Sequence, residues 1–312
     1  MASAVAKRYS TAMQPPPSSS RPLLRFAPSP NGRLHLGHAF SALETWRLAD
    51  ALGGEVLLRI EDIDLGRTRE AFVAGITEDL SWLGLTWPTP VRRQSQHFAD
   101  YSSAADQLRS QGLLYPSMAT RRDISDAIAG TSDWPCDPDG APLYPRTLLG
   151  PETHVDCDGA AWRLDMRKAM ARATVEHPSG LAYQAFDAAG RLTRCVARPE
   201  RWGDVLLVRK ETPTSYHLSV VVDDALQGIT HVTRGADLAT ATDIHVLLKS
   251  VLGLPQPLYH HHPLITDAGG RKLSKRFQDT SLAELRAQGW APDDVREAVC
   301  ASRVADADRP DL

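Results

Sequence analysis

The apolar residues of this chain first alternate between strand-like and helix-like spacing. Residues 23–27 and 55–60 are short apolar segments typical of buried strands. Each is followed by apolar residues at helical spacing, at 37–52 and 71–83, and each helical segment ends at glycine. Because strand–helix–strand order favours parallel strands joined by crossover helices, we expect an α/β fold with a doubly wound, Rossmann-like parallel sheet.

The middle of the chain predicts an insertion within this sheet. Between 112 and 203, proline, glycine and aspartate recur and hydrophobic periodicity is weak, which indicates an inserted α+β module. Buried-strand character returns at 204–208 and 220–222. Helical spacing then covers 242–252, and 258–265 is typical of a last strand.

We therefore expect five segments. They are a disordered leader at 1–22, the first half of a Rossmann-like domain at 23–111, the inserted module at 112–203, the second half with a lysine loop at 204–276, and a short acidic C-terminal tail at 277–312. The leader contains Pro-Pro-Pro-Ser-Ser-Ser and no acid, as disordered segments often do. A transit peptide would also lack acids, but two arginines and no amphipathic pattern disfavour it.

The composition is that of a globular protein with a sizeable core. Of 312 residues, 42% are hydrophobic and 23% charged, and no apolar run approaches the ~18 residues of a membrane span. The four cysteines are scattered without a C-x-x-C pair, which favours a reducing, cytoplasmic location.

The net charge is −3, but residues 160–210 hold ten basic against five acidic residues. That segment could face a phosphate backbone, although charge alone favours a solvated face.

Two histidines three positions apart open the first predicted helix. His35 and His38 flank Gly37 in a His-x-Gly-His step that follows a strand. Glycine allows backbone to approach a ligand closely, and the start of a helix attracts anions. The step therefore indicates a nucleotide phosphate site, although two ordinary surface histidines would fit the same residues.

A second basic segment lies far along the chain, in a glycine-rich loop. Lys272, Ser274, Lys275 and Arg276 follow Gly269-Gly270-Arg271. Lysine suits phosphate because its ammonium is a compact charge on a flexible stem. Taken alone, the segment would be an exposed basic loop; beside the histidine step it predicts a triphosphate site.

Charged residues also lie at the ends of the first two predicted strands. Arg25 precedes the turn Pro28-Ser29-Pro30, and Glu61, Asp62 and Asp64 end the second strand. Ligands bind at the carboxyl ends of strands in open parallel sheets. The alternatives are an ordinary ion pair for the arginine and helix capping for the aspartates.

Six blocks of this sequence, in order, resemble the catalytic half of glutamyl-tRNA synthetases, class I enzymes with "HIGH" and "KMSKS" motifs. The blocks are residues 25–30, 35–38, 59–64, 216–224, 228–237 and 272–276. The resemblance covers about residues 23–276 and implies that 23–111 and 204–276 form the catalytic domain, with 112–203 an acceptor-binding-like module. Only 36 residues follow Arg276, fewer than an anticodon-binding region needs. The chain is therefore most similar to the glutamyl-queuosine tRNA(Asp) synthetase family.

The resemblance implies a ligase that activates L-glutamate with ATP and transfers it to the queuosine base of tRNA(Asp). It places glutamate among Arg25, Phe26, Ala27, Pro28, Ser29, Glu61, Tyr216 and Arg234. The two arginines would bind the two carboxylates, and Glu61 would hold the ammonium. We also expect a monomer without a membrane partner.

The same resemblance assigns the nucleotide site. It implies that ATP, accompanied by Mg²⁺, contacts His35, Gly37, His38, Lys272, Ser274 and Lys275. The catalytic residues would be His35, His38 and Lys275. Two alternatives stay open: a glutamate-activating ligase whose acceptor is not tRNA, and an inactive paralogue that binds RNA.

No resident metal is expected. Residues 260–262 are all histidines, but neighbours on a strand point to opposite faces, so a ligand set is incomplete. The family's module usually holds zinc through C-x-C and Tyr-x-x-x-Cys. The corresponding residues here are 117–119, without cysteine, and Tyr144. Cys136 and Cys157 are too isolated to replace the set, so we expect no structural zinc and a module held by ordinary packing.

Overall fold

The computed structural model describes residues 21–149, 159–265 and 280–307, and all structural statements concern these residues. The N-terminal half contains β1 (Leu23–Phe26), α2 (Leu36–Ala51), β2 (Glu55–Ile60), α3 (Glu70–Trp82), β3 (Arg92–Arg93), η1 (Gln94–Gln96), α4 (Phe98–Ser110), β4 (Leu114–Ser117), α5 (Arg121–Ile128) and α6 (Arg146–Leu149). The remainder contains β5 (Ala161–Leu164), α7 (Met166–Glu176), β6 (Ala182–Phe186), β7 (Leu192–Val196), η2 (Pro199–Trp202), β8 (Leu206–Val208), α8 (Tyr216–Leu226), β9 (His231–Gly235), η3 (Ala236–Leu238), α9 (Ala241–Leu252), β10 (Leu258–His262), α11 (Leu282–Ala287) and α12 (Pro292–Ala307). The predicted leader and lysine loop, with Lys272, Ser274 and Lys275, lie outside the described residues, apart from the last two positions of the leader.

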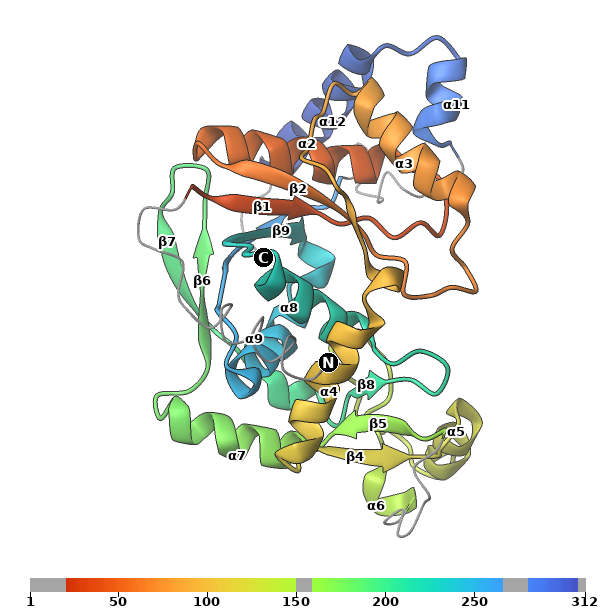
Figure 1. The fold of residues 1–312 in the computed structure, drawn as a ribbon, viewed down its shortest axis with the longest axis vertical. Helices are drawn as coiled ribbons and strands as arrows, with labels where there is room; N and C mark the ends of the chain where they lie inside the picture. The colour runs from red at the N-terminus through yellow and green to blue at the C-terminus, as the bar shows by residue number, and fades with distance from the viewer. Residues whose placement is uncertain (1–20, 150–158, 266–279, 308–312) are drawn as a thin grey trace.

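Parallel strands form the centre of the molecule. One sheet has the order β1-β2-β3 and the other β7-β6-β10-β9, with β6, β10 and β9 mutually parallel. The two sheets meet where the backbone N–H of Thr230 donates to Leu23 O at 2.9 Å. Figure 1 shows α2, α3, α11 and α12 on one side of β1 and β2, with α8 and α9 on the other. The expected α/β class with a Rossmann-like parallel sheet is confirmed.

One predicted strand is wrong. Residues 220–222 lie inside α8, and every residue of that helix from Leu218 to Ala225 is buried. Three consecutive valines are typical of a strand, but a helix surrounded by other elements is also apolar on every side. Contacts with α4 and α9 therefore outweighed local β-propensity.

The segment expected to be an inserted module contributes to two sheets. β4, β5 and β8 form an antiparallel sheet next to α5 and α6, at the end of the molecule far from α2 (Figure 1). The hairpin β6–β7 lies in the same segment, yet β6 pairs with β10 in the central sheet. The chain therefore leaves the central sheet after β3 and re-enters it at β6.

The segment expected to be an acidic tail carries α11 and α12. Leu282, Leu285, Val295 and Val299 are buried in the same core cluster as residues of α2 and α3. The backbone N–H of Leu282 donates to Leu34 O at 2.8 Å, directly before the histidine step. This segment therefore packs against α2 and supports the start of that helix. Within the described residues, no helix is long and apolar enough to cross a membrane.

Candidate active site

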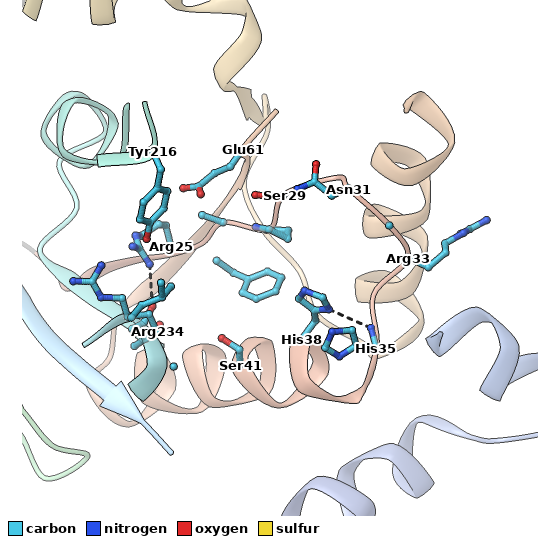
Figure 2. Close-up of a pocket in the computed structure, with 17 residues that line it drawn as sticks. Arg25, Ser29, Asn31, Arg33, His35, His38, Ser41, Glu61, Tyr216 and Arg234 are labelled. Carbon is cyan, nitrogen blue, oxygen red and sulfur yellow. Dashed lines mark hydrogen bonds between the residues drawn. The ribbon is translucent and has the colours of Figure 1, made fainter. Parts of the chain in front are cut away.

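A cavity of about 610 Å³ opens at the carboxyl ends of β1 and β2, beside the start of α2 (Figure 2). Its lining comes from β1 and the turn after it, the first turns of α2, the end of β2, the start of α8, and the β9–η3 corner. The lining residues are Arg25, Phe26, Ala27, Pro28, Ser29, Asn31, Gly32, Arg33, His35, His38, Ser41, Glu61, Tyr216, Thr233, Arg234, Gly235 and Leu238.

The cavity brings together residues that the sequence singled out separately. Every residue expected around glutamate lines it, from Arg25 to Arg234, and so do His35 and His38. Gly37 lies beside the lining. The backbone N–H of Glu61 donates to Pro28 O at 3.1 Å, which ties the turn after β1 to the end of β2.

The histidine step caps α2 with its own side chains. His35 Nδ1 accepts from the backbone N–H of Gly37 at 3.1 Å, and His38 Nδ1 accepts from the backbone N–H of His35 at 3.3 Å. Because each Nδ1 is an acceptor, each neutral ring carries its proton on Nε2. Both rings therefore keep an N–H donor that the helix cap does not use.

Burial keeps these two rings uncharged. It lowers the pKa of His35, and burial together with His35 lowers the pKa of His38 to about 3. The ring centroids lie 3.9 Å apart. A Cβ at position 37 would lie 2.9 Å from His35 Cε1, so a side chain there would displace the capping ring. This end of the cavity offers neutral donors at a helix N-terminus, an arrangement suited to phosphate.

Figure 2 shows Arg25, Glu61 and Arg234 at the opposite end of the cavity. Two of them, Arg25 and Glu61, belong to a chain of buried charges. Arg25 Nε donates to Asp224 Oδ1 at 3.2 Å, and Arg59 Nη1 donates to the same oxygen at 2.9 Å. Arg59 Nη2 lies 3.2 Å from Glu61 Oε1. Arg25 Nη1 also donates to Thr233 O at 3.0 Å. Asp224 and Arg59 thus fix one arginine and one carboxylate that face the cavity.

The pKa values in this chain follow from burial and pairing. Burial raises the pKa of the Glu61 carboxyl above its ordinary value, although Arg59 and Arg25 lower it. The pKa of Asp224 is held far below its usual range; burial opposes this, but Arg25 and Arg59 outweigh it. Burial lowers the pKa of Lys249, which lies beneath the network, to about 8.

Arg234 faces the same space from β9 with different support. Its side chain is buried, and within the described residues it forms no ion pair with a carboxylate. It donates to His245 Nδ1 at 3.1 Å and to Thr242 Oγ1 at 2.5 Å, both from α9. Among the described residues, its Nε has no hydrogen-bond partner. In this part of the chain, the cavity therefore presents a buried cation without a compensating anion.

The comparisons with known proteins agree with this geometry. The model of the family described as class I tRNA synthetases (E and Q), catalytic domain, matches residues 23–133 and 163–305. The chain belongs to the class I tRNA synthetase (E and Q) family. It is 45% identical over 285 residues to the glutamyl-Q tRNA(Asp) synthetase of Rhodobacter capsulatus, covering 89% of this chain and 99% of that relative. The resemblance inferred from the six sequence blocks is confirmed.

Two other relatives are longer than the region that this chain matches. Glutamate–tRNA ligase 2 of Methylorubrum populi is 36% identical over 94% of this chain and 62% of its own. A solved glutamate–tRNA ligase from Elizabethkingia meningosepticum, in complex with its amino acid, superposes with a TM-score of 0.64 and 26% identity. This chain covers 53% of that structure, so it spans about half of the solved synthetase.

Sequence reasoning about this synthetase missed several lining residues. Asn31 and Arg33 lie between the blocks 25–30 and 35–38, and no role was assigned to them from the sequence. Ser41 is three positions after His38, so helical spacing places both on one face of α2. Thr233 and Leu238 line the cavity from the β9–η3 corner, where nothing in the local pattern distinguishes them.

The histidines of β10 serve the packing of this synthetase domain. His260 Nδ1 lies 2.9 Å from Phe186 O, His261 Nε2 lies 2.9 Å from Thr242 Oγ1, and His262 Nε2 lies 3.0 Å from Ser41 Oγ. These partners are hydroxyl and carbonyl oxygens from three different elements, and His260 Nε2 also lies 3.6 Å from Glu44 Oε1 of α2.

The segment of the module that corresponds to the family's zinc site does not fit zinc. Ser117 Oγ lies 2.9 Å from the Tyr144 hydroxyl, and the Arg163 guanidinium stacks 3.8 Å from the Tyr144 ring centroid. Cys136 is exposed, and Cys157 lies outside the described residues. Hydroxyls and a cation stand where zinc would require thiolates or imidazoles.

Proposed function

We propose that this protein activates L-glutamate with ATP and transfers the glutamyl group to the queuosine base of tRNA(Asp). The observation that carries the proposal is the charge arrangement of the cavity. Glutamate has two carboxylates and one ammonium, and the cavity faces it with Arg25, Arg234 and Glu61. A relative named glutamyl-Q tRNA(Asp) synthetase, matched over 99% of its length, supports the acceptor.

The supporting residues make this match specific. Arg25 shares Asp224 with Arg59, so its charge is partly compensated inside the protein. Arg234 has no such compensation in the described chain and binds the second carboxylate. Charge-assisted hydrogen bonds contribute about 1.5–3 kcal/mol each, enough to favour a dicarboxylic amino acid over an uncharged one. Tyr216, at the start of α8, closes this end of the cavity.

The first step needs positioning rather than an enzyme nucleophile. An oxygen of the glutamate α-carboxylate attacks the α-phosphorus of ATP in line, and pyrophosphate leaves with the electron pair of the broken P–O bond. ATP enters as its magnesium complex, so Mg²⁺ is part of the substrate. The Nε2–H groups of His35 and His38 donate to phosphate oxygens at the start of α2. Lys272, Ser274 and Lys275 are assigned to the triphosphate from the sequence alone.

In the second step a hydroxyl of queuosine attacks the glutamyl carbonyl. The C–O bond to AMP breaks, AMP leaves, and the hydroxyl proton is released. We also propose that the protein is a monomer located in the cytoplasm. The basic segment 160–210 and the scattered cysteines are the features of the sequence that support RNA binding and the location.

Two assays test the proposal. Glutamate-dependent ATP–pyrophosphate exchange without RNA measures activation, and its absence would favour an inactive RNA-binding paralogue. Transfer of labelled glutamate is then compared on tRNA(Asp) with and without queuosine. Transfer only to the queuosine form supports the proposal, whereas exchange without transfer to either form points to a ligase with a different acceptor. Equal charging of tRNA(Glu) would indicate an ordinary glutamyl-tRNA synthetase.

We also propose that the module works without zinc. The Ser117–Tyr144 contact and the Arg163–Tyr144 stack replace metal ligation with ordinary packing. Elemental analysis of the purified full chain provides the test. We expect only trace zinc, less than about 0.1 ion per chain. Stoichiometric zinc would overturn this part of the proposal.

A further inference from the structure

Two buried arginines reach the amino-acid end of the cavity, and their surroundings differ. Arg25 and Arg234 are equally buried, each with 5% of its surface exposed. Arg25 pairs with the carboxylate of Asp224. Arg234 has no carboxylate partner within the described residues; an imidazole, the Thr242 hydroxyl and the Tyr216 side chain support it. A buried charge without a partner is costly, so this difference requires an explanation.

The hydrogen bonds around Arg234 define the protonation of its imidazole support. A guanidinium can only donate, so His245 Nδ1 must accept the bond from Arg234 Nη1 at 3.1 Å. His245 is then neutral, with its proton on Nε2. That N–H points to His217 Nδ1 at 3.2 Å, which accepts it. One tautomer of each ring satisfies the chain, and neither ring needs a positive charge.

The hydroxyl support follows the same logic. Thr242 Oγ1 accepts from Arg234 Nη2 at 2.5 Å and lies 2.9 Å from His261 Nε2, to which it can donate. Thr242 and His245 are three positions apart on α9, so both reach Arg234 from one face of the helix. Burial and Arg234 lower the pKa of His217 to about 4 and of His261 to about 3, consistent with neutral rings.

Other groups near Arg234 leave its charge uncompensated. Asp243, the neighbouring acid on α9, pairs with Arg201 of η2 at 2.7 Å. Lys249, further along α9, is a second buried basic group, and its Nζ donates to Val221 O at 3.3 Å. The remaining neighbours are aromatic: the Tyr259 ring centroid lies 5.5 Å from the guanidinium carbon, and Tyr216 packs against His245.

We infer that His245 is a positioning and specificity-determining residue: by supporting Arg234 through a neutral acceptor, it keeps that cation available for a substrate carboxylate. The inference rests on the proposed function, because it assigns to α9 the choice of a side chain ending in a carboxylate over one ending in an amide. A carboxylate at position 245 would satisfy Arg234 from within the protein. The cavity would then have one uncompensated positive charge fewer, and its charges would match glutamine better than glutamate.

The matched variants His245→Gln and His245→Glu separate acceptor geometry from charge. Both side chains have the same size and offer an oxygen to Arg234, but only glutamate carries a charge. We expect H245Q to lower kcat/KM for glutamate by less than about tenfold, and H245E to lower it by ~100-fold or more through KM. The KM for ATP should change little in either. Glutamate-over-glutamine preference in pyrophosphate exchange should fall at least tenfold in H245E relative to H245Q.

A measurement without substrate keeps the inference separate from the enzyme activity. In thermal unfolding of the full chain, H245E should melt at a higher temperature than H245Q, because it supplies the missing partner of a buried cation. Equal losses in the two variants, with no difference in melting temperature, would show that His245 acts only by packing and would overturn the inference. If the wild type shows no glutamate-dependent exchange, the proposed function fails, while the melting comparison still decides how Arg234 is supported.

Variants of Thr242 provide a second test of the inference in case the His245 variants do not fold. Thr242→Ser keeps the hydroxyl acceptor, whereas Thr242→Val keeps the shape and removes it. We expect T242S to match the wild type within about threefold and T242V to raise the KM for glutamate about tenfold, with the KM for ATP unchanged. Equal KM values for glutamate in T242V and T242S would contradict a positioning role for the supports on α9.

Discussion

The two ends of the cavity solve different problems with different side chains. At the amino-acid end, Arg25, Glu61 and Arg234 are charged groups held by other buried groups. At the nucleotide end, His35 and His38 are neutral donors held by backbone N–H groups at a helix start. Fixed charges suit a substrate whose charges are fixed. Neutral donors aimed at phosphate suit a position where charge moves between oxygens during the reaction.

This comparison also separates stability from binding. Charges in the amino-acid end that compensate each other hold the fold together, whereas an uncompensated charge serves the ligand at the expense of stability. The nucleotide end is built from one helix turn and should contribute little to global stability. The expected effects below therefore run from the amino-acid network to the helix start.

The largest effect is expected at Asp224. Removing its charge leaves Arg25 and Arg59 buried without their shared partner, so Asp224→Asn should lower the free energy of unfolding by about 3 kcal/mol. It should also raise the KM for glutamate, because Arg25 loses its fixed position. The adjacent Asp223→Asn is the matched control. Asp223 accepts from Arg92, Gln94 and Tyr101 and lies 3.8 Å from Arg59 Nε, but it forms no ion pair with Arg25, so D223N should lose stability with a smaller change in that KM than D224N.

A denaturant series on D224N and D223N, combined with pyrophosphate exchange, measures both quantities. A D224N protein with wild-type stability would mean that Arg25 and Arg59 find other partners and that the network is not what fixes the amino-acid end.

Arg234 should show the opposite signature. Arg234→Met removes the uncompensated cation, so kcat/KM for glutamate should fall by ~100-fold or more. The same change should leave thermal stability equal or higher, because no buried carboxylate loses its partner in the described chain. Arg234→Lys keeps the charge but loses the paired N–H donors of the guanidinium. Its kcat/KM for glutamate should therefore lie between those of the wild type and R234M. A strongly destabilised R234M protein would contradict the assignment of Arg234 as a group kept for the ligand.

How far the sequence predicts each end follows from where its residues lie. His35, Gly37 and His38 occupy one helix turn, so spacing alone indicated a phosphate site. Arg25 and Arg234 lie on two strands, and Glu61 directly follows a third. The strand ends suggested that Arg25 and Glu61 share a site, but only the resemblance to a family added Arg234 before the structure did. The supports are less visible still: Asp224, Thr242 and His245 are ordinary helix residues until α8 and α9 pack beside the sheet.

The same reasoning explains the element that was predicted wrongly. Residues 220–222 are apolar because α8 is enclosed by the sheet, α4 and α9. A run of valines reports burial, and burial does not distinguish a strand from an enclosed helix. The parallel sheet, in contrast, follows from element order, which long-range packing does not alter.

At the nucleotide end, His38 should have an intermediate effect confined to ATP. His38→Ala removes one Nε2–H donor and the acceptor for the His35 backbone N–H, so the KM for ATP should rise about 10- to 100-fold. His38→Asn can restore the cap but not the donor at the position of Nε2. We expect both variants to keep wild-type affinity for glutamate, measured by isothermal titration without ATP. A parallel loss of glutamate affinity would show that the two ends are coupled.

Gly37→Ala tests the cap with a smaller change. Its Cβ would lie 2.9 Å from His35 Cε1 and 3.1 Å from His35 Nδ1, so the ring must move away from the helix start. We expect the KM for ATP to rise about fivefold, in line with the loss of part of one hydrogen bond. Asp50→Ala, at an exposed position near the end of α2 and outside the cavity lining, is the control that adds no atom near His35. Unchanged ATP kinetics in G37A would mean that the position of His35 does not matter for the nucleotide.

The smallest effect distinguishes the two ends by their response to pH. Burial raises the pKa of Glu61, so on acidification this carboxyl gains its proton at a higher pH than an exposed one. Only the ionised form binds the substrate ammonium, so the Kd for glutamate should rise a few-fold, roughly as partial protonation of one carboxyl predicts, as the pH falls. The pKa of His38 is lowered to about 3, so that ring stays neutral throughout. Glutamate binding without ATP, followed by calorimetry from pH 8 downward on the wild type and on Glu61→Gln, isolates the carboxyl from the titration of ATP itself. The variant should bind weakly with no acidic dependence; an identical slope in both proteins would assign the titration to a group other than Glu61.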